Sequence, residues 1–333
     1  MKTECYSPAE GDVLSELRSF LQSAGLRYDR SVRQTVIKRD GSGRIAATGS
    51  LDGRVIKCVA VRPDCQGGPL AGEIVKDLAR LAKESGESHL FLFTRPENQP
   101  AFEQLGFYPV EKTDDALLME NQPDGVERWL QTVPRCGEGI TGAIVANCAP
   151  MTNGHLYLIQ KAKLLCDQLY LFVLSEDKGE IPADDRLEMV RAATAGIPGV
   201  VVCPSGNYQV SAATFPGYFL RDETEVRRVS CELDLKLFAC RIAAPLGISR
   251  RFVGQEPYST LTEHYNRYMK EILPQYGVSL VEFSRLRAGD KGFVNAGAVR
   301  RLWAEGDLPK LERMVPPAVF KYLSSHRPRN SQA

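Results

Sequence analysis

The stretch Thr141–Lys163, TGAIVANCAPMTNGHLYLIQKAK, decides the fold of the second half of this 333-residue chain. It begins with an apolar run of strand length, turns at Pro150, and continues as an amphipathic segment with helical spacing. A strand that turns directly into a helix is the unit of doubly wound α/β sheets. The helix would begin near Thr152, so its unpaired backbone N–H groups and positive dipole end predict a polyphosphate site.

His155 stands at this predicted helix start. As an imidazolium it would hydrogen-bond an α-phosphate and stabilise charge as pyrophosphate leaves, which is an electrostatic rather than a nucleophilic role. Thr152 and Gly154 lie within the same turn. A T-x-G-H string also arises by chance, and the alternative is a histidine that only caps the helix or lies on the surface.

The remainder of the second half alternates strands with helices. Apolar strands are predicted at 141–147, 168–174, 200–204, 251–253 and 279–283. Helical periodicity is predicted at 155–165, 183–194, 232–244, 263–273 and 296–303. This alternation predicts a parallel doubly wound sheet, whose ligands lie beyond the carboxyl ends of the strands.

Two later segments would reach that edge of the sheet. Gly254 and Glu256 follow the fourth predicted strand, where a loop commonly holds the base or ribose, and the alternative is an ordinary turn. Asn295 and Gly297 lead into a helix whose Arg300 could clamp leaving phosphates with its planar donors. A solvated helix arginine is the alternative there.

Two further segments are weaker candidates. Ser175–Lys178 follows the second predicted strand and could act on magnesium or substrate through its carboxylates, although an exposed charged loop is equally expected. Phe215–Phe219 is aromatic, which favours a packing element over a groove for a thioester arm.

The first half has a different pattern. Helices are predicted at 12–24, 70–83 and 99–105, and strands at 34–38, 44–51, 55–61, 89–93 and from 107 onward. A hairpin followed by alternating helices and strands predicts an α+β domain. Breaker residues are frequent between 121 and 139. We therefore expect domains at 1–125 and 139–325, a linker at 126–138 and a disordered tail at 326–333.

Composition limits the classes of function. With 42 basic and 41 acidic residues the net charge is +1, so nucleic acid is not an expected partner. No apolar run has the length of a membrane span and the first residues lack a signal core, which predicts a cytoplasmic protein. Nine cysteines without C-x-x-C pairs and four histidines predict neither a disulfide framework nor a resident metal cage. Any metal would arrive with nucleotide.

The chain resembles citrate lyase ligase, also called citrate lyase synthetase, over nearly its whole length. The resemblance is carried by Asn147, Pro150, Thr152–His155, Ala213–Pro216, Tyr218, Phe219, Glu232, Asp234–Lys236, Gly254, Glu256, Pro257 and Arg300. That family is similar to GNAT acetyltransferases in its N-terminal part and to HxGH nucleotidyltransferases in its C-terminal part. It implies an α/β chain with a GNAT-like α+β domain, followed by a doubly wound parallel-sheet (Rossmann-like) nucleotidyltransferase domain.

The resemblance implies an AMP-forming acid–thiol ligase that uses ATP with Mg²⁺. Acetate would attack the α-phosphate, and the acetyl group would pass from acetyl-AMP to the prosthetic-group thiol of the citrate lyase acyl carrier, a dephospho-CoA derivative. Thr152 would bind phosphate, His155 would stabilise the transition state and Arg300 would hold pyrophosphate. Residues implied to bind ATP are Asn147, Pro150, Gly154, Gly254, Glu256, Asn295 and Gly297.

The GNAT-like part of the resemblance lies at Val59–Val61, Gln66–Gly67 and Phe102–Phe107. Its fold would place a pyrophosphate loop before the helix that starts at Leu70. Gln66, Gly67 and Gly68 could therefore dock the prosthetic arm, since turn N–H groups suit a diphosphate. Pro69 removes one such donor.

Some residues depart from the family pattern. Ala149 replaces an asparagine, Met151 replaces an aromatic residue, and Asn295 and Gly297 replace two serines. The lost hydroxyl donors are compatible with transition-state binding weaker by about 1–3 kcal/mol. These departures leave open a catalytically silent nucleotide- or carrier-binding regulator. Simple adenylyl transfer onto a phosphopantetheine-like substrate and acetyl transfer by the N-terminal half are further alternatives.

Overall fold

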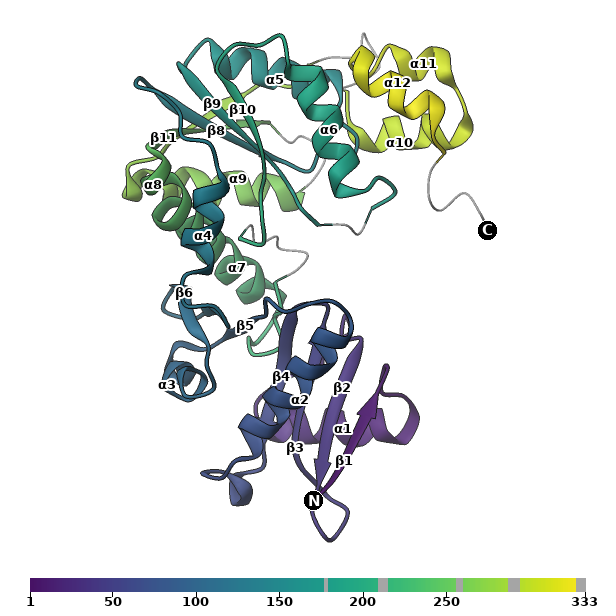
Figure 1. Cartoon of the computed structure of the whole chain (residues 1–333), viewed down its shortest axis with the longest axis vertical. Helices are drawn as coiled ribbons and strands as arrows, with labels where there is room; N and C mark the ends of the chain where they lie inside the picture. Colours follow the sequence, from purple (N-terminus) through teal and green to yellow (C-terminus); the bar gives the residue numbers. More distant parts are fainter. Residues whose placement is uncertain (177–178, 209–214, 256–259, 287–293, 328–333) are drawn as a thin grey trace. The chain divides into compact units, whose positions relative to one another are not determined.

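The computed structural model describes residues 1–176, 179–208, 215–255, 260–286 and 294–327. They form two compact units, one comprising Met1–Glu127 with Val210–Leu237 and the other Arg128–Gln209 with Phe238–Ala333 (Figure 1). This division differs from the expected boundaries. Helix α7 (Glu223–Leu237), expected in the second domain, belongs to the first unit, and α4 (Gly125–Thr132) occupies half of the expected linker.

The first unit is built on a mixed sheet of strand order β1-β2-β3-β4-β5-β7-β6. Its strands are β1 (Lys2–Tyr6), β2 (Gln34–Arg39), β3 (Ile45–Asp52), β4 (Val55–Val61), β5 (Phe91–Thr94), β6 (Tyr108–Lys112) and β7 (Leu117–Glu120). Besides α7, its helices are α1 (Gly11–Ser23), α2 (Leu70–Glu84) and α3 (Gln99–Glu103). The predicted hairpin and helices are confirmed, whereas β1 and β7 were not predicted. Leu70, Ile74 and Leu78 form the buried stripe of α2 because they recur every four residues.

The parallel pair β4–β5 interrupts this otherwise antiparallel sheet. The two strands pair only through Val55–Ile56 and Phe91–Leu92, although β4 continues to Val61 and β5 to Thr94. A register shift against β3 puts a bulge in β4 at Cys58, whose φ is 54°. The carboxyl ends of these two strands are therefore not paired with each other.

The segment Phe215–Leu220 occupies this opening. Tyr218 donates a hydrogen bond from its hydroxyl to the carbonyl oxygen of Phe93 on β5 (2.8 Å), and the same hydroxyl faces the backbone of Cys58 on β4. The backbone N–H of Arg27 donates to the carbonyl oxygen of Tyr218 (2.7 Å). The aromatic rings of the segment are buried, which confirms the predicted packing role.

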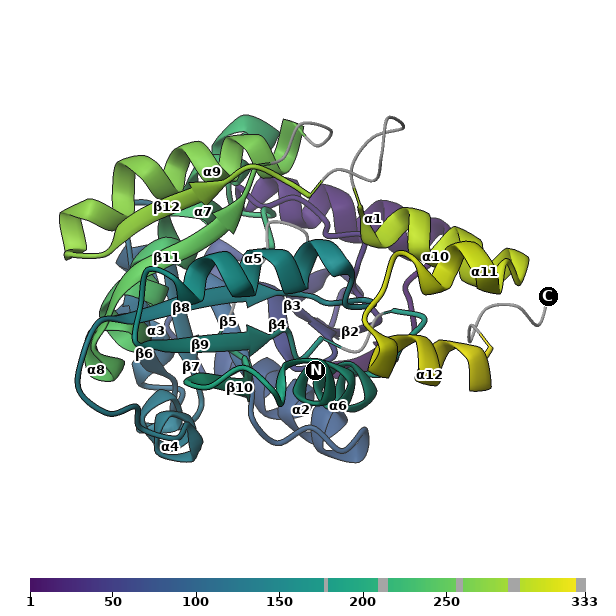
Figure 2. The same ribbon diagram turned by 90° about the horizontal axis from the view of Figure 1, so that it is seen from above.

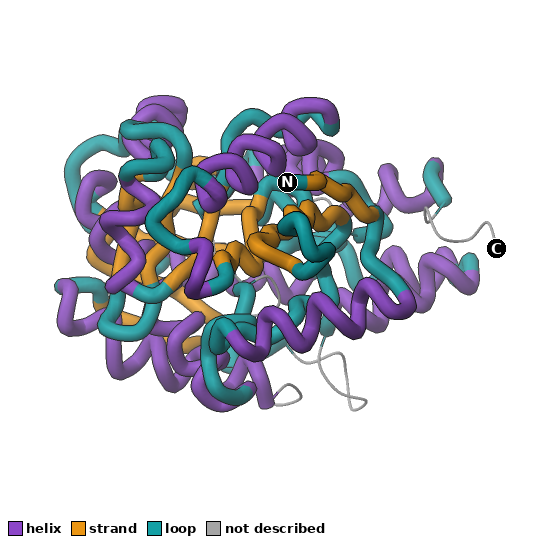
Figure 3. The backbone as a smooth tube through the Cα atoms, turned by 90° about the horizontal axis from the view of Figure 1, so that it is seen from below, coloured by secondary structure: helices purple, strands orange, loops and turns teal. Residues whose placement is uncertain are grey.

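The second unit is an all-parallel sheet of order β10-β9-β8-β11-β12, which confirms the predicted doubly wound fold (Figure 2). Its strands are β8 (Thr141–Ala146), β9 (Gln168–Val173), β10 (Val200–Pro204), β11 (Ile248–Gly254) and β12 (Ser279–Phe283). Its helices are α5 (Asn153–Lys163), α6 (Ala183–Thr194), α8 (Ala244–Leu246), α9 (Thr260–Ile272), α10 (Ala296–Glu305), α11 (Leu308–Glu312) and α12 (Pro317–Ser325), with a π-helical turn at Phe238–Ala243. Figure 3 shows the helices of the chain in purple and its strands in orange. None of the helices among the described residues has the length and apolarity needed to cross a membrane.

Candidate functional site

The predicted phosphate-binding turn lies where expected, between β8 and α5. Thr152 is the N-cap of α5, and its hydroxyl accepts a hydrogen bond from the backbone N–H of His155 (3.4 Å). In return, the backbone N–H of Thr152 donates to Nδ1 of His155 (3.0 Å). This reciprocal capping box fixes the imidazole at the positive end of the helix.

The hydrogen bonding of His155 determines its tautomer. Because a backbone N–H can only donate, Nδ1 is the unprotonated ring nitrogen and the proton lies on Nε2. Burial, helped by the positive charge of Arg285, lowers the pKa of His155 to about 4. The expectation of an imidazolium is therefore wrong for the protein without nucleotide, where the ring is a neutral Nε2–H donor. The ring keeps partial exposure, at the wall of a cavity.

This cavity has a volume of about 830 Å³ and lies beyond the carboxyl ends of β8, β11 and β12. Its lining includes Asn147, His155, Gly254, Arg285 and Asn295. The size suits a nucleotide-sized ligand, and the position is the one expected for ligands of a parallel sheet.

The rim of this cavity is held by side chains that bind backbone carbonyls. Asn266 donates from Nδ2 to the carbonyl oxygen of Gly254 (3.2 Å), and Arg285 donates from Nε to the carbonyl oxygen of Gln255 (2.6 Å). Glu256, a predicted ATP ligand, lies outside the described residues, as do Ala213, Thr214 and Pro257. The loop that starts at Gly254 is thus anchored on the cavity side.

Gly154 allows α5 to approach the loop before α10. A Cβ at this position would lie 3.3 Å from Oγ1 of Thr152 and 3.3 Å from the carbonyl oxygen of Val294. Asn295 caps α10, its Oδ1 accepting from the backbone N–H of Ala298 (2.8 Å), so this oxygen is committed to the helix. A Cβ at Gly297 would make only an ordinary contact.

Arg300 faces a second, smaller cavity of about 400 Å³. From the first turns of α10 its Nη1 reaches the carbonyl oxygen of Ala149 (2.6 Å) in the loop after β8. His155 and Thr152 line the larger cavity and not this one, whereas Asn147 lines both. The three predicted catalytic residues therefore lie on adjoining cavities that meet at Asn147.

The two departures next to Pro150 have structural explanations. Ala149 contributes its backbone carbonyl to Arg300, a contact that does not depend on its side chain. Met151 is fully buried in the core of the second unit, and Pro150 is buried beside it. Ala149 and Met151 therefore shape the turn, and neither lines the larger cavity.

Sequence reasoning missed Arg186 on α6. It is 2% exposed and donates to the backbone and side-chain oxygens of Asn147 and to the carbonyl oxygen of Glu176. Its position was detectable, because Arg186 shares the buried face of α6 with Met189 and Val190. A charged residue on an apolar helix face indicates a specific buried partner.

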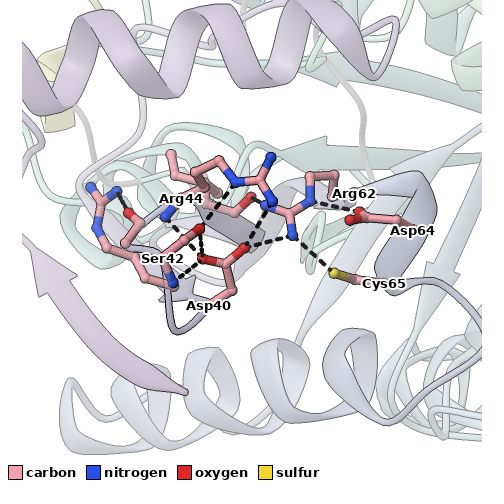
Figure 4. A network of polar contacts seen from close by, with 9 residues as sticks. Asp40, Ser42, Arg44, Arg62, Asp64 and Cys65 are labelled. Atoms are coloured by element: carbon pink, nitrogen blue, oxygen red, sulfur yellow. Dashed lines mark hydrogen bonds and ion pairs between the residues drawn. The ribbon is translucent and has the colours of Figure 1, made fainter.

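The predicted arm-docking loop lies in the first unit, between β4 and α2. Gly67 has a φ of +77°, and α2 begins without a side-chain cap, which leaves its first N–H groups available. Arg62 anchors the turn before this loop through Asp40 (2.7 Å) and Asp64 (2.6 Å), and it also contacts Cys65 (Figure 4). These contacts hold the end of the loop that follows β4.

The first unit has a mixed sheet and a glycine-containing loop before α2. The second has a parallel sheet with a histidine at the N-terminus of α5. The chain therefore joins a GNAT-like domain to a nucleotidyltransferase-like domain. The acetyltransferase (GNAT) family matches residues 4–107, and the citrate lyase ligase C-terminal domain matches residues 141–323. The chain belongs to the citrate lyase ligase family. This confirms the resemblance and the fold class seen in the sequence.

Curated relatives agree with this assignment. The chain is 36% identical to the [citrate [pro-3S]-lyase] ligase of Escherichia coli K12, over 95% of this chain and 92% of that protein. It is 38% identical to the enzyme of the same name from Klebsiella pneumoniae, over 91% of this chain and 90% of that protein. A shorter match, 42% identical over 17% of this chain and 37% of the relative, is to a phosphopantetheine adenylyltransferase of Clostridium botulinum.

Proposed function

We propose that this chain is an AMP-forming ligase that uses ATP to acetylate the citrate lyase acyl carrier with acetate. The observation that carries the proposal is the junction of two cavities at Asn147, with a neutral imidazole donor on one and a guanidinium on the other. This arrangement suits a nucleotide whose α-phosphate lies at His155 and whose leaving phosphates lie at Arg300. Membership of the citrate lyase ligase family supports the choice of carrier.

The proposed reaction has two steps. A carboxylate oxygen of acetate attacks the α-phosphorus, the bond to the β-phosphate oxygen breaks, and pyrophosphate leaves. The carrier thiolate then attacks the acetyl carbonyl, AMP leaves, and the thiol proton passes to solvent. Nε2–H of His155 and the guanidinium of Arg300 would stabilise the charge that develops in the first step.

The other predicted ATP ligands take supporting roles in this proposal. Thr152 and Gly154 present the N-terminal N–H groups of α5 to phosphate. Gly254 and Glu256 would border the base or ribose, and Asn295 and Gly297 would approach the phosphates. Pro150 would shape the turn.

Magnesium fits the smaller cavity. Glu176 and Glu180 line it, and the buried Oε2 of Glu180 has no hydrogen-bond partner among the described residues. The described residues contain no group of three or more His, Cys, Asp or Glu side chains that could hold a metal. Mg²⁺ typically binds through one or two carboxylates and substrate phosphates, and these two glutamates could supply them. The ion would neutralise phosphate charge.

The prosthetic arm is proposed to dock by its diphosphate at Gln66, Gly67 and Gly68, where α2 begins without a side-chain cap. The cytoplasm is the proposed location, since the reaction consumes ATP and all nine cysteines are free thiols.

The decisive experiment incubates the protein with ATP, magnesium and acetate, with and without deacetylated acyl carrier, and follows AMP and the acetylated thiol. Acetate-dependent AMP and carrier acetylation, lost in His155→Ala and retained in His264→Ala, are the expected result. His264 is an exposed residue of α9 and serves as the matched control. ATP binding without AMP would overturn the ligase in favour of a silent binding protein, and pyrophosphate exchange that needs no acetate would favour adenylyl transfer.

A further inference from the structure

Arg186 reaches the point where the two cavities meet. One of its terminal nitrogens donates to both oxygens of Asn147, the backbone carbonyl at 2.7 Å and the side-chain Oδ1, and the other donates to the carbonyl oxygen of Glu176. These acceptors belong to the loops that follow β8 and β9. The guanidinium therefore ties together the carboxyl ends of two neighbouring strands.

The contact also orients the amide of Asn147. An arginine side chain has only donors, so the atom that faces it must be the amide oxygen. The NH₂ group of Asn147, with two donors, is then the part of this exposed side chain that is left for the cavities it lines. Donors suit phosphate oxygens, whereas the reversed amide would present an acceptor.

We infer that Arg186 is a positioning residue that holds Asn147 with its amide donors toward the polyphosphate at the junction of the two cavities. The inference rests on the proposed function for its ligand. Arg186 is buried at the wall of the smaller cavity, and its bonds to two oxygens of Asn147 and one of Glu176 let it act through Asn147. A planar guanidinium can hold several acceptors at once, which a lysine ammonium on a flexible stem does not reproduce.

Asn147→Asp provides the first test. The carboxylate keeps the bond to Arg186 and strengthens it, so thermal stability should be retained. It has no donors and carries negative charge, so the dissociation constant for magnesium ATP should rise tenfold or more. Retained affinity in a stable Asn147→Asp protein would overturn the inference.

A double-mutant cycle gives the second test. Arg186→Lys should slow acetate-dependent AMP formation by about 100-fold, the loss expected from misplacement of a contact by about 1 Å. The same change in an Asn147→Ala background should cost much less, because the residue it positions is gone. Equal losses in both backgrounds would overturn the inference. Arg191→Lys, on the exposed side of the same helix, is the control.

The cycle is also measured on ATP affinity by calorimetry. If the wild-type protein binds ATP and forms no AMP with acetate, the proposed function fails, but the cycle on affinity still tests Arg186. If the wild-type protein is active and the cycle is additive, only the positioning role fails.

Discussion

Both units open a pair of parallel strands at their carboxyl ends, yet the two openings differ in what they contain. In the second unit, the ends of β8 and β11 border a cavity of about 830 Å³ with a capped histidine at its wall. In the first unit, the ends of β4 and β5 are separated by Phe215–Leu220. The same backbone arrangement thus leaves a cavity in one unit and is filled by a packed segment in the other.

The difference lies in how the backbone groups at each opening are satisfied. Tyr218 supplies a donor to β5 from a buried side chain, and burial raises its pKa well above the usual value, so it stays a neutral donor. In the loop after β8, the carbonyl oxygens of Asn147 and Ala149 accept hydrogen bonds from Arg186 and Arg300. These contacts leave a cavity open beside the loop. A likeness in topology therefore does not locate a site until the occupant of the opening is known.

Removal of the occupant should have the largest effect. Tyr218→Ala deletes a buried aromatic ring and leaves the Phe93 carbonyl unpaired, so the first unit should lose about 3–5 kcal/mol of unfolding free energy. Far-UV circular dichroism in urea would detect this loss. Trp129 and Trp303 both belong to the second unit, so their fluorescence follows the unfolding of that unit.

Tyr108→Ala, at an exposed tyrosine of the same unit, is the control for this loss. Unchanged stability of Tyr218→Ala together with new binding of dephospho-CoA would show that the opening between β4 and β5 is a ligand site after all.

Loss of the donor in the second opening comes next. His155→Ala removes the Nε2–H donor and should lower kcat for acetate-dependent AMP formation by about 10²–10³-fold, the usual loss for one preorganised donor. Loss of the capping box should cost about 1 kcal/mol of stability. Steady-state kinetics with a melting curve separates the two effects, and activity within threefold of wild type would remove His155 from the mechanism.

A smaller change should narrow the open cavity without removing any polar group. Gly154→Ala puts a methyl group 3.3 Å from the carbonyl oxygen of Val294, so the loop before α10 must shift, at a cost of about 1–3 kcal/mol. We expect weaker ATP binding, measured by calorimetry. Gly196→Ala, where a methyl group meets nothing within 4 Å, should leave affinity unchanged. Equal ATP affinities for the two variants would mean that the close contact between Gly154 and Val294 does not shape the site.

The protonation state of His155 decides whether kcat/KM falls about tenfold at pH 5.5, as a ring with the usual pKa would require, or stays unchanged. Its pKa in the folded protein is about 4, below the usual 6.5, so folding favours the neutral ring. That stabilisation is complete above pH 6.5 and is lost as the pH falls from 6.5 toward 4. A ring with the usual pKa would be about 90% protonated at pH 5.5.

The measurement is an NMR titration of the His155 Cε1 resonance, assigned with His155→Ala. A midpoint near 4, with kcat/KM unchanged between pH 8 and 5.5, is expected. A midpoint at or above 6.5 would contradict the neutral ring and support the prediction that His155 acts as an imidazolium.

The sequence predicted the parts of the site that follow a local rule. Thr152 and His155 lie at the start of α5 as predicted, and the parallel order of the second sheet follows from its alternation of strands and helices. The charge of His155 was missed because it depends on burial and on Arg285, which is distant in sequence. Arg186 was missed for the same reason, since its partners lie on two other loops.

The errors in the fold also come from contacts between distant segments. Helix α7 was predicted at 232–244, but it begins at Glu223, where Asp222 caps the chain, and it gives way to a π-helical turn at Phe238. Strand β7 is four residues long and gains its stability from pairing with β5 and β6. Short elements of this kind carry little periodicity of their own.

The smallest expected effect concerns the exposed loop beside the filled opening. Gly67→Ala forces a side chain onto a residue with φ of +77°, which costs about 1 kcal/mol and should distort the loop. Because Phe215–Leu220 occupies the opening itself, this loop is the part of the first unit still available to a diphosphate. We therefore expect KM for the acyl carrier to rise a few-fold, with KM for ATP unchanged. Gly68→Ala, at ordinary φ and with its nearest contact at 3.9 Å, tests the same loop without backbone strain. If Gly67→Ala leaves KM for the carrier unchanged, the loop does not dock the arm.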